Sequence, residues 1–514
     1  MNILRTKSVE QSIRDTEEPE HQLRKVLGPL DLIVFGIGVI IGTGIFVLTG
    51  VAAATRAGPA IALSFVAAGI ACGLAALCYA EFASSVPVAG SAYTFSYASL
   101  GEFIAWVIGW DLVLEFMVGA SAVSIGWSQY FNAILQSLGL ALPHAIAGGK
   151  GAVIDLPAAG IVLLLTLILV TGIHLSSRFN LTITTIKLAV VVFFIVFGVF
   201  FIKVANWTPF IPPPAPLSSS GGGGGGVWDA PLLQLILGLK QQAFGFSGII
   251  TGAATVFFAY IGFDIVATTA EETRNPQRNM PIGIIGSLAI CTFLYIVVSL
   301  VMTGVVSYKQ LDTAAPMATA FAAIGQPWAA ALVSLGALCG LTAVIMILML
   351  GQSRVFFAMS RDNLLPTWFA RVHPRFGTPY RISIITGIIV AVIAAFTPID
   401  AVADLVNIGT LLAFVLVSIG VIILRRTRPD MHRAFRTPLV PLVPILAVLT
   451  CFYLMISLPL ITWVRFVVWL AIGIVLYFVY GMHHSRLARG EIAEGGPATI
   501  EEWEQPEVRA RNRG

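Results

Sequence analysis

Long uninterrupted apolar runs recur along this chain of 514 residues and constrain its fold more than any other feature. A helix needs about 20 mostly apolar residues to cross the hydrocarbon core of a bilayer. The runs are uniformly apolar, without the alternating polarity of β-barrel strands. The sequence therefore predicts an all-α membrane protein with twelve transmembrane helices, at residues 31–56, 60–83, 102–131, 156–173, 181–202, 246–270, 284–306, 328–357, 380–397, 402–424, 439–459 and 461–481.

Composition supports the bilayer as the main solvent of the chain. Hydrophobic residues make up 57%, charged residues 11%, and the mean hydropathy is +0.90. The loops between the runs are too short to hold a soluble domain, so we expect no enzyme. Five cysteines fall inside apolar runs without a CxxC pair, so we expect buried apolar side chains and no metal site: Cys72, Cys78, Cys291, Cys339 and Cys451.

Basic residues predict the orientation in a cytoplasmic (inner) membrane, because Lys and Arg accumulate in cytoplasmic loops. With both termini inside, most of the 30 lysines and arginines face the cytoplasm. Their spread over short loops, at a net charge of +4, argues against a nucleic-acid partner. The predicted organisation is a cytoplasmic segment at 1–27, a transporter domain at 28–483 with a flexible Pro/Gly-rich outer loop at 203–245, and a cytoplasmic tail at 484–514.

Glycine-rich interruptions occur in two of the apolar runs. The first run reads GIGVIIGTGIF over residues 36–46, and the sixth reads FFAYIGFD over residues 257–264. An unpaired backbone group in a bilayer costs on the order of several kcal/mol, so an unwound stretch persists where it lines a cavity or is buried in protein. Close helix packing is the alternative explanation for such glycines. A repeat of five spans is inverted relative to its copy, so we predict that the two breaks face each other.

Two longer stretches carry a more specific resemblance. They are CYAEFASSVPVAGSAYTFSYASLGEFIAWVIGWDLVLEF at 78–116 and AEETRNPQRNMPIGI at 270–284. With the two breaks, they make the chain resemble the amino acid-polyamine-organocation superfamily of permeases, and within it the bacterial cationic amino acid transporters. The resemblance extends over about residues 22–483. It implies the five-plus-five inverted repeat of leucine-transporter-like carriers, with helices one and six broken and two further C-terminal helices.

The resemblance also implies where an amino acid substrate would bind. Its carboxylate would lie against the backbone of Thr43 and Gly44, at the start of the second half of helix one, where a helix N-terminus favours an anion. Its ammonium would meet backbone carbonyls of both breaks, at Ile40, Ile41, Phe258, Ala259 and Ile261.

Lys187 is the predicted site of energy coupling. It lies in the fifth apolar run, roughly 12 Å deep at about 1.5 Å per residue. In proton-linked members of the resembled family a lysine amine occupies this place, whereas sodium-coupled relatives have hydroxyl ligands there. Removal from water favours the uncharged amine, so such a lysine can exchange protons near neutral pH. The alternative is that its long stem reaches the inner interface and has no role in coupling.

Acidic residues in the spans are further candidates. Asp111 and Glu115 are four residues apart in the third run, so they share one helix face. Exposure of these two carboxylates to lipid would cost free energy, so we expect the face to turn into the bundle. We predict that Glu115 and Asp264 contribute to gating or specificity, with a role in helix packing as the alternative. In the inner loop, Arg274, Asn275 and Arg278 lock the closed cytoplasmic side or act as positive-inside anchors.

These observations predict a secondary active transporter of amino acids that works by alternating access. The expected coupling ion is the proton, and no organic cofactor is expected. A sodium-coupled or exchange mechanism is the alternative within transport. A membrane amino acid sensor is the alternative of another class, and the lack of a recognisable signalling domain argues against it. Membrane lipid surrounds the protein, and a small accessory membrane subunit is a further possible partner.

Overall fold

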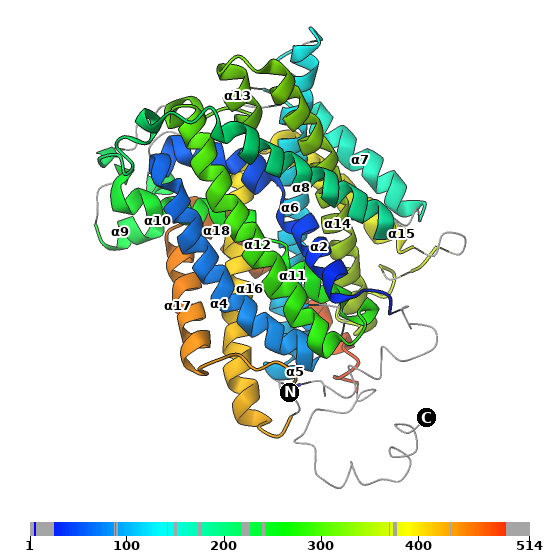
Figure 1. Ribbon diagram of the computed structural model, residues 1–514. Coiled ribbons are helices and arrows are strands. Elements are labelled where there is room, and N and C mark those ends of the chain that lie inside the picture. Colours follow the sequence, from blue (N-terminus) through cyan, green and yellow to red (C-terminus); the bar gives the residue numbers. More distant parts are fainter. Residues whose placement is uncertain are drawn as a thin grey trace.

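The structure is a computed structural model that describes residues 5–6, 25–86, 88, 91–140, 142–148, 152–172, 177–216, 227–238, 242–369, 371–373, 378–431 and 433–489. The described part is mostly helical, and its long helices pack side by side in one bundle (Figure 1). A two-stranded antiparallel sheet, β1 (Ala215–Pro216) with β2 (Gln242–Ala243), lies in the connection before helix six. The principal helices are α2 (Pro29–Ile40), α4 (Ile61–Ser85), α5 (Ala92–Ser99), α6 (Glu102–Ser137), α7 (Leu156–Val170), α8 (Ser177–Val199), α10 (Gly245–Val256), α12 (Pro276–Val305), α14 (Pro327–Arg361), α15 (Tyr380–Phe396), α16 (Ile399–Thr427), α17 (Leu442–Ile456) and α18 (Leu460–Leu476).

Helical segments long and apolar enough to cross a membrane number eight among the described residues. They are Gly44–Ser85, Glu102–Ser137, Leu181–Val199, Gly245–Glu272, Pro276–Val305, Pro327–Arg361, Ile399–Thr427 and Leu460–His484. Shorter apolar helices occur at α2, α7, α15 and α17. Together these segments occupy all twelve apolar runs of the sequence. The chain is a mostly helical, multi-pass membrane protein.

Helix starts follow from local sequence. At α2, Pro29 occupies the first turn, where it has no amide hydrogen to leave unpaired, and the Asp31 carboxylate accepts a hydrogen bond from the Gly28 amide at 2.8 Å. At α12, Asn275 adopts a left-handed conformation with φ 47° and is followed by Pro276. Both helices therefore begin at residues that local sequence defines.

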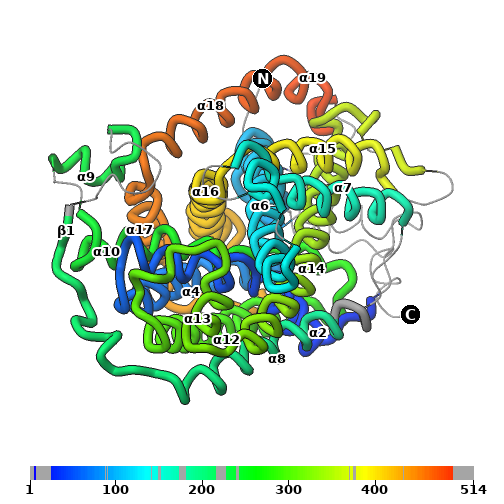
Figure 2. The backbone as a smooth tube through the Cα atoms, turned by 90° about the horizontal axis from the view of Figure 1, so that it is seen from above, coloured from blue at the N-terminus to red at the C-terminus, as the bar shows by residue number. Residues whose placement is uncertain are grey.

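Helix α6 lies at the centre of the bundle, between α14 and α16 (Figure 2). Helix α18 lies at the periphery and is held to α6 by aromatic side chains. The rings of Trp110 and Trp469 stack with centroids 4.5 Å apart, and each indole donates to the backbone carbonyl of the other residue. A methyl group on Gly473 would lie 2.3 Å from the Trp110 ring, so this glycine permits the close approach.

The described parts of the connection at 203–245 are bonded to neighbouring helices, and the flexibility of the connection stays a prediction. The Lys203 amide donates to the Gly304 carbonyl at 2.9 Å, and the Trp207 indole donates to the Leu300 carbonyl at 3.2 Å. A short helix, α9 (Leu232–Ile236), follows. Backbone bonds to a neighbouring helix fix these parts. The six glycines at 221–226 lie outside the described residues.

Cysteine burial differs from the sequence expectation at one position. Cys72, Cys78, Cys291 and Cys451 are buried, as small apolar side chains in a core would be. Cys339 on α14 is exposed, so the prediction that all five are buried is wrong there. Hydropathy identifies a span but not which of its faces turns outward, and this residue lies on the outward face.

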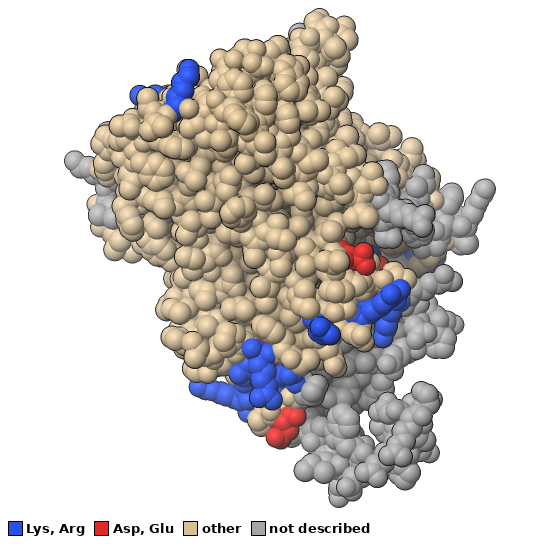
Figure 3. Space-filling view, in the orientation of Figure 1, with Lys and Arg blue, Asp and Glu red and all other residues tan. Residues whose placement is uncertain are grey.

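Basic side chains gather at one end of the molecule on the face seen in Figure 3, the lower end of that view. Arg425, on α16, forms two hydrogen bonds with the buried carboxylate of Glu81 on α4, at 2.9 and 2.7 Å. The Arg433 Nε lies 3.3 Å from the same carboxylate. Paired, hydrogen-bonded charges of this kind are the form in which buried ions are tolerated. Part of the basic content therefore fixes loops to helices.

Arg5 is held by a second buried carboxylate at this end. Its guanidinium lies 3.2 Å from Glu102 at the start of α6, and its carbonyl accepts from the Glu102 amide at 2.9 Å. Hydroxyl groups of Tyr97, Tyr477 and Ser485 also donate to the Glu102 carboxylate. Arg5 is thus attached to the start of α6, and its partner Glu102 also binds residues that follow α18, which the sequence did not predict.

Candidate substrate and coupling site

The break in helix one follows α2. The helix ends at Ile40, and Ile41 is extended, with φ −71° and ψ 94°. After Gly42 and Thr43 the chain resumes as a π-helix, Gly44–Leu48, which continues into α3 (Thr49–Ala52). The last carbonyls of a helix have no partner within it, so those of α2 must be satisfied from elsewhere.

The break in helix six follows α10 and the 3-10 helix Phe257–Tyr260. Ile261 is extended, and Gly262 has φ 121°, a conformation that residues with a side chain rarely adopt. The next helix, α11 (Phe263–Val266), is followed by the 3-10 helix Ala267–Glu272. The Gly262 amide donates to the Asp264 carboxylate at 3.2 Å, so this amide is satisfied within the break itself.

The two breaks are in direct contact. A methyl group on Gly44 would lie 2.3 Å from the Ala259 Cα, and one on Gly262 would lie 3.3 Å from the Ile40 amide nitrogen. Backbones approach this closely only where side chains are absent. The structure therefore brings together the residues predicted to bind substrate, with Ile40, Ile41, Thr43, Gly44, Phe258, Ala259 and Ile261 all buried.

Lys187 is fully buried, and its amine donates to the carbonyl of Gly38 at 2.6 Å. Its stem passes Gly340 of α14, where a methyl group would lie 2.5 Å from the Lys187 Cδ. In this structure the side chain does not extend to an interface. It satisfies a freed carbonyl at the C-terminal end of α2, where the helix dipole favours a cation.

Tyr295 of α12 was not identified from the sequence. Its hydroxyl lies 2.7 Å from the Ile40 carbonyl and 2.7 Å from the Ala259 carbonyl, one in each break. The residue is fully buried. A tyrosine within an apolar run gives no sequence signal of its own, because its partners are backbone atoms far away along the chain.

Thr43 is buried against α6. Gly126 faces it so closely that a methyl group there would lie 2.7 Å from the Thr43 Cγ2. The Thr43 hydroxyl has no hydrogen-bond partner among the described groups. The break in helix one therefore has packed neighbours on three sides, from α6, α8 and α12.

The acidic candidates are all buried. Asp111 and Glu115 of α6 and Asp264 of α11 have side chains at most 1% exposed, so none of them faces lipid. Asp111 lies against Gly409 of α16, where a methyl group would be 2.6 Å from its Oδ1. The roles of Glu115 and Asp264 in gating or specificity stay predictions.

The start of helix one and the end of helix six are joined through their backbones. The Leu27 amide donates to the Glu272 carbonyl at 3.0 Å, and the Arg274 amide donates to the Leu27 carbonyl at 2.9 Å. The Glu272 side chain also forms an ion pair with Arg354 of α14 at 2.9 Å. Arg278 and Asn275 are exposed, so the predicted lock at this loop stays a prediction.

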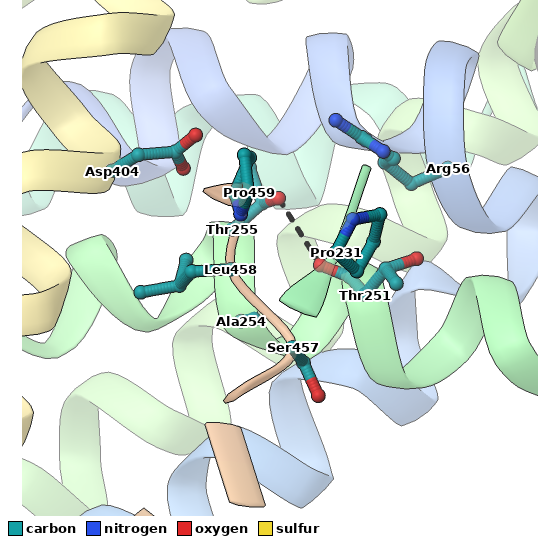
Figure 4. A pocket seen from close by; sticks show the side chains of 9 residues that line it. All are labelled: Arg56, Pro231, Thr251, Ala254, Thr255, Asp404, Ser457, Leu458 and Pro459. Carbon is teal, nitrogen blue, oxygen red and sulfur yellow. Dashed lines mark hydrogen bonds between the residues drawn. The ribbon is translucent and has the colours of Figure 1, made fainter. Parts of the chain in front are cut away.

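A small pocket lies between α10, α16 and the segments around Pro231 and Leu458 (Figure 4). Arg56 and Asp404 are at opposite sides of it, and the Thr255 hydroxyl donates to the Thr251 carbonyl beneath. Its volume of about 10 Å³ accommodates one water molecule and no amino acid. The candidate substrate site therefore lies at the breaks and not in this pocket.

Comparisons with known proteins identify permeases and transporters as relatives of this chain. A family profile described as amino acid permease matches residues 27–481. The methylthioribose transporter of Bacillus subtilis (strain 168) is 46% identical over 469 residues, covering 90% of this chain and 95% of that protein. The branched-chain amino acid permease BcaP of the same organism is 46% identical over 493 residues, covering 95% and 99%. The vacuolar cationic amino acid transporter 4 of Arabidopsis thaliana is 37% identical over 433 residues, covering 84% and 68%.

Proposed function

Since the chain belongs to the amino acid permease family, within the amino acid-polyamine-organocation superfamily, we propose that it is a secondary active transporter that moves amino acids across the cytoplasmic membrane by alternating access with a proton as coupling ion. Family membership supports amino acid transport and excludes an enzyme. The proposal includes twelve spans, an inverted five-plus-five repeat and cytoplasmic termini.

The observation that carries the coupling proposal is the bond from Lys187 to the Gly38 carbonyl. A protonated amine satisfies that carbonyl as a charged donor, and hydrogen bonds to charged groups contribute about 1.5–3 kcal/mol. After deprotonation the attraction between the amine and the end of α2 weakens. Protonation therefore favours one arrangement of helix one relative to α8, which is what coupling requires.

Recognition of the amino acid is proposed to use backbone atoms of both breaks. The carbonyls of Ile40 and Ala259 already converge on one hydroxyl group, so they lie within reach of one ammonium. An ammonium has three donors and forms such bonds with good geometry. Thr43 and Gly44 would receive the carboxylate at the start of the second half of helix one.

Two relatives that are each 46% identical to this chain are named for different substrates. One is named a methylthioribose transporter and the other a branched-chain amino acid permease. Methylthioribose carries no ammonium group. A panel of both compound classes therefore tests whether backbone recognition of an ammonium applies to this chain.

The experiment is uptake into proteoliposomes containing the purified protein. Labelled leucine, alanine, arginine and methylthioribose are supplied with and without an inward proton gradient, in sodium-free buffer. Amino acid uptake that increases with the gradient supports the proposal. Uptake that requires sodium favours a sodium-coupled carrier, and counterflow without gradient response favours an exchanger. Binding without any transport favours a sensor.

A further inference from the structure

Tyr295 of α12 contacts both broken helices through one oxygen atom. Its hydroxyl lies 2.7 Å from the last carbonyl of α2, at Ile40, and 2.7 Å from the carbonyl of Ala259 in helix six. A phenol has a single proton, so it donates to only one of the two carbonyls at a time. The pair of carbonyls is therefore satisfied in part by the protein itself.

Aromatic packing keeps the hydroxyl in this position. The Tyr295 ring lies 5.4 Å from the rings of both Phe65 and Tyr260, measured between centroids. Tyr260 in turn donates its own hydroxyl to the Phe65 carbonyl at 2.7 Å. Both tyrosines are fully buried. Tyr295 thus approaches the breaks from a rigid cluster that joins α4, helix six and α12.

We infer that Tyr295 is a positioning residue that donates to one or the other of the freed carbonyls of Ile40 and Ala259 when no substrate ammonium is bound, and so allows the unloaded carrier to change its facing. This inference rests on the proposed function, because it assumes that an ammonium takes these carbonyls during transport. A buried carbonyl without a donor is costly. In a carrier without the Tyr295 hydroxyl, these carbonyls would lack that donor only when no ammonium is bound. The unloaded state alone would therefore be destabilised.

The consequence is a kinetic difference between two modes of transport. Net uptake requires the unloaded carrier to return, whereas exchange of external for internal substrate proceeds with the site loaded in both directions. Removal of the Tyr295 hydroxyl therefore slows net uptake and spares exchange. A residue needed only for folding would reduce both modes by the same factor.

The test compares Tyr295→Phe with wild type and with Tyr260→Phe in proteoliposomes. Tyr260→Phe is the matched control, since it removes a buried hydroxyl from the same aromatic cluster that bonds to Phe65 and to neither break. For each protein, net uptake and exchange of the best wild-type amino acid are measured per folded carrier. We expect the ratio of net uptake to exchange to fall about tenfold in Tyr295→Phe, the factor that one unsatisfied buried carbonyl produces, and to stay at the wild-type value in Tyr260→Phe.

An unchanged ratio in Tyr295→Phe, whether both modes persist or both decline, overturns the inference. A wild-type protein that neither takes up nor exchanges an amino acid overturns the proposed function instead, so the two failures are distinguishable. If Tyr295→Phe does not fold, Phe65→Leu retains the hydroxyl but loosens the ring that positions it. A smaller selective fall in net uptake is then expected, and an unchanged ratio again overturns the inference.

Discussion

The two broken helices solve the same problem in different ways. In helix one, the freed carbonyls of Gly38 and Ile40 are bound by side chains from other helices, Lys187 of α8 and Tyr295 of α12. In helix six, the Ala259 carbonyl is bound by the same Tyr295, and the Gly262 amide donates to Asp264, two residues further along the same chain. The Gly38 carbonyl of helix one is therefore held by an amine from another helix, whereas the turn at Gly262 is held by its own segment. The proposed coupling through Lys187 thus acts on the first break.

Gly44→Ala gives the largest expected effect, because it affects the contact between the two breaks. The new methyl group would lie 2.3 Å from the Ala259 Cα, and a backbone atom cannot yield as a side chain does. Overpacking costs about 1–3 kcal/mol, so amino acid uptake in proteoliposomes should fall about tenfold or more. Gly42→Ala is the matched control, because its methyl group would have its nearest contact at 3.7 Å and should retain uptake. Equal uptake by the two variants would contradict a tight contact between the breaks.

Asp264→Ala tests the local hydrogen bond in the turn of helix six. Loss of the acceptor for the Gly262 amide should lower the free energy of unfolding by about 1 kcal/mol, the net value of a typical intramolecular hydrogen bond. Asp264→Asn keeps a side-chain oxygen and should recover most of that loss. The measurement is thermal unfolding of purified protein in detergent. If Asn is as destabilising as Ala, the negative charge and not the acceptor holds the turn.

Arg354→Gln should have the smallest effect of the three. The ion pair with Glu272 fixes the C-terminal end of helix six to α14, but its side chains are 39% and 28% exposed. Exposed pairs contribute about 0.2–1 kcal/mol, so unfolding should shift little and the shift should vanish at high salt. A loss larger than that of Asp264→Ala would show that the inner end, and not the local turn, stabilises helix six.

Sequence predicts the breaks well, because glycine and the interruption of an apolar run are local signals. Lys187 is equally visible as a charge inside a span. The sequence does not show what these groups contact. Tyr295 reaches carbonyls 255 and 36 residues away, and Arg425 reaches Glu81 across 344 residues. Such partners depend on how the helices pack, and no spacing along one chain encodes them.

Which helix faces are exposed, and which bonds the 203–245 connection forms, do not follow from the sequence either. Cys339 is exposed although its run is apolar, since lipid-facing and buried positions have the same hydropathy. The described parts of the 203–245 connection are fixed by bonds to backbone groups such as the Gly304 carbonyl, which composition cannot predict. Gly340 makes room for the Lys187 stem because it has no side chain. That role depends on which residue packs against it, so the sequence does not reveal it.

The most direct test of the account is uptake by Lys187→Ala in proteoliposomes with an inward proton gradient and no sodium, measured beside exchange in the same preparation. We predict that gradient-driven accumulation is lost while exchange of amino acid persists, since the substrate carbonyls at Ile40 and Ala259 bond to Tyr295 and not to Lys187. Gradient-driven accumulation at the wild-type level in Lys187→Ala would contradict the assignment of proton coupling to this residue.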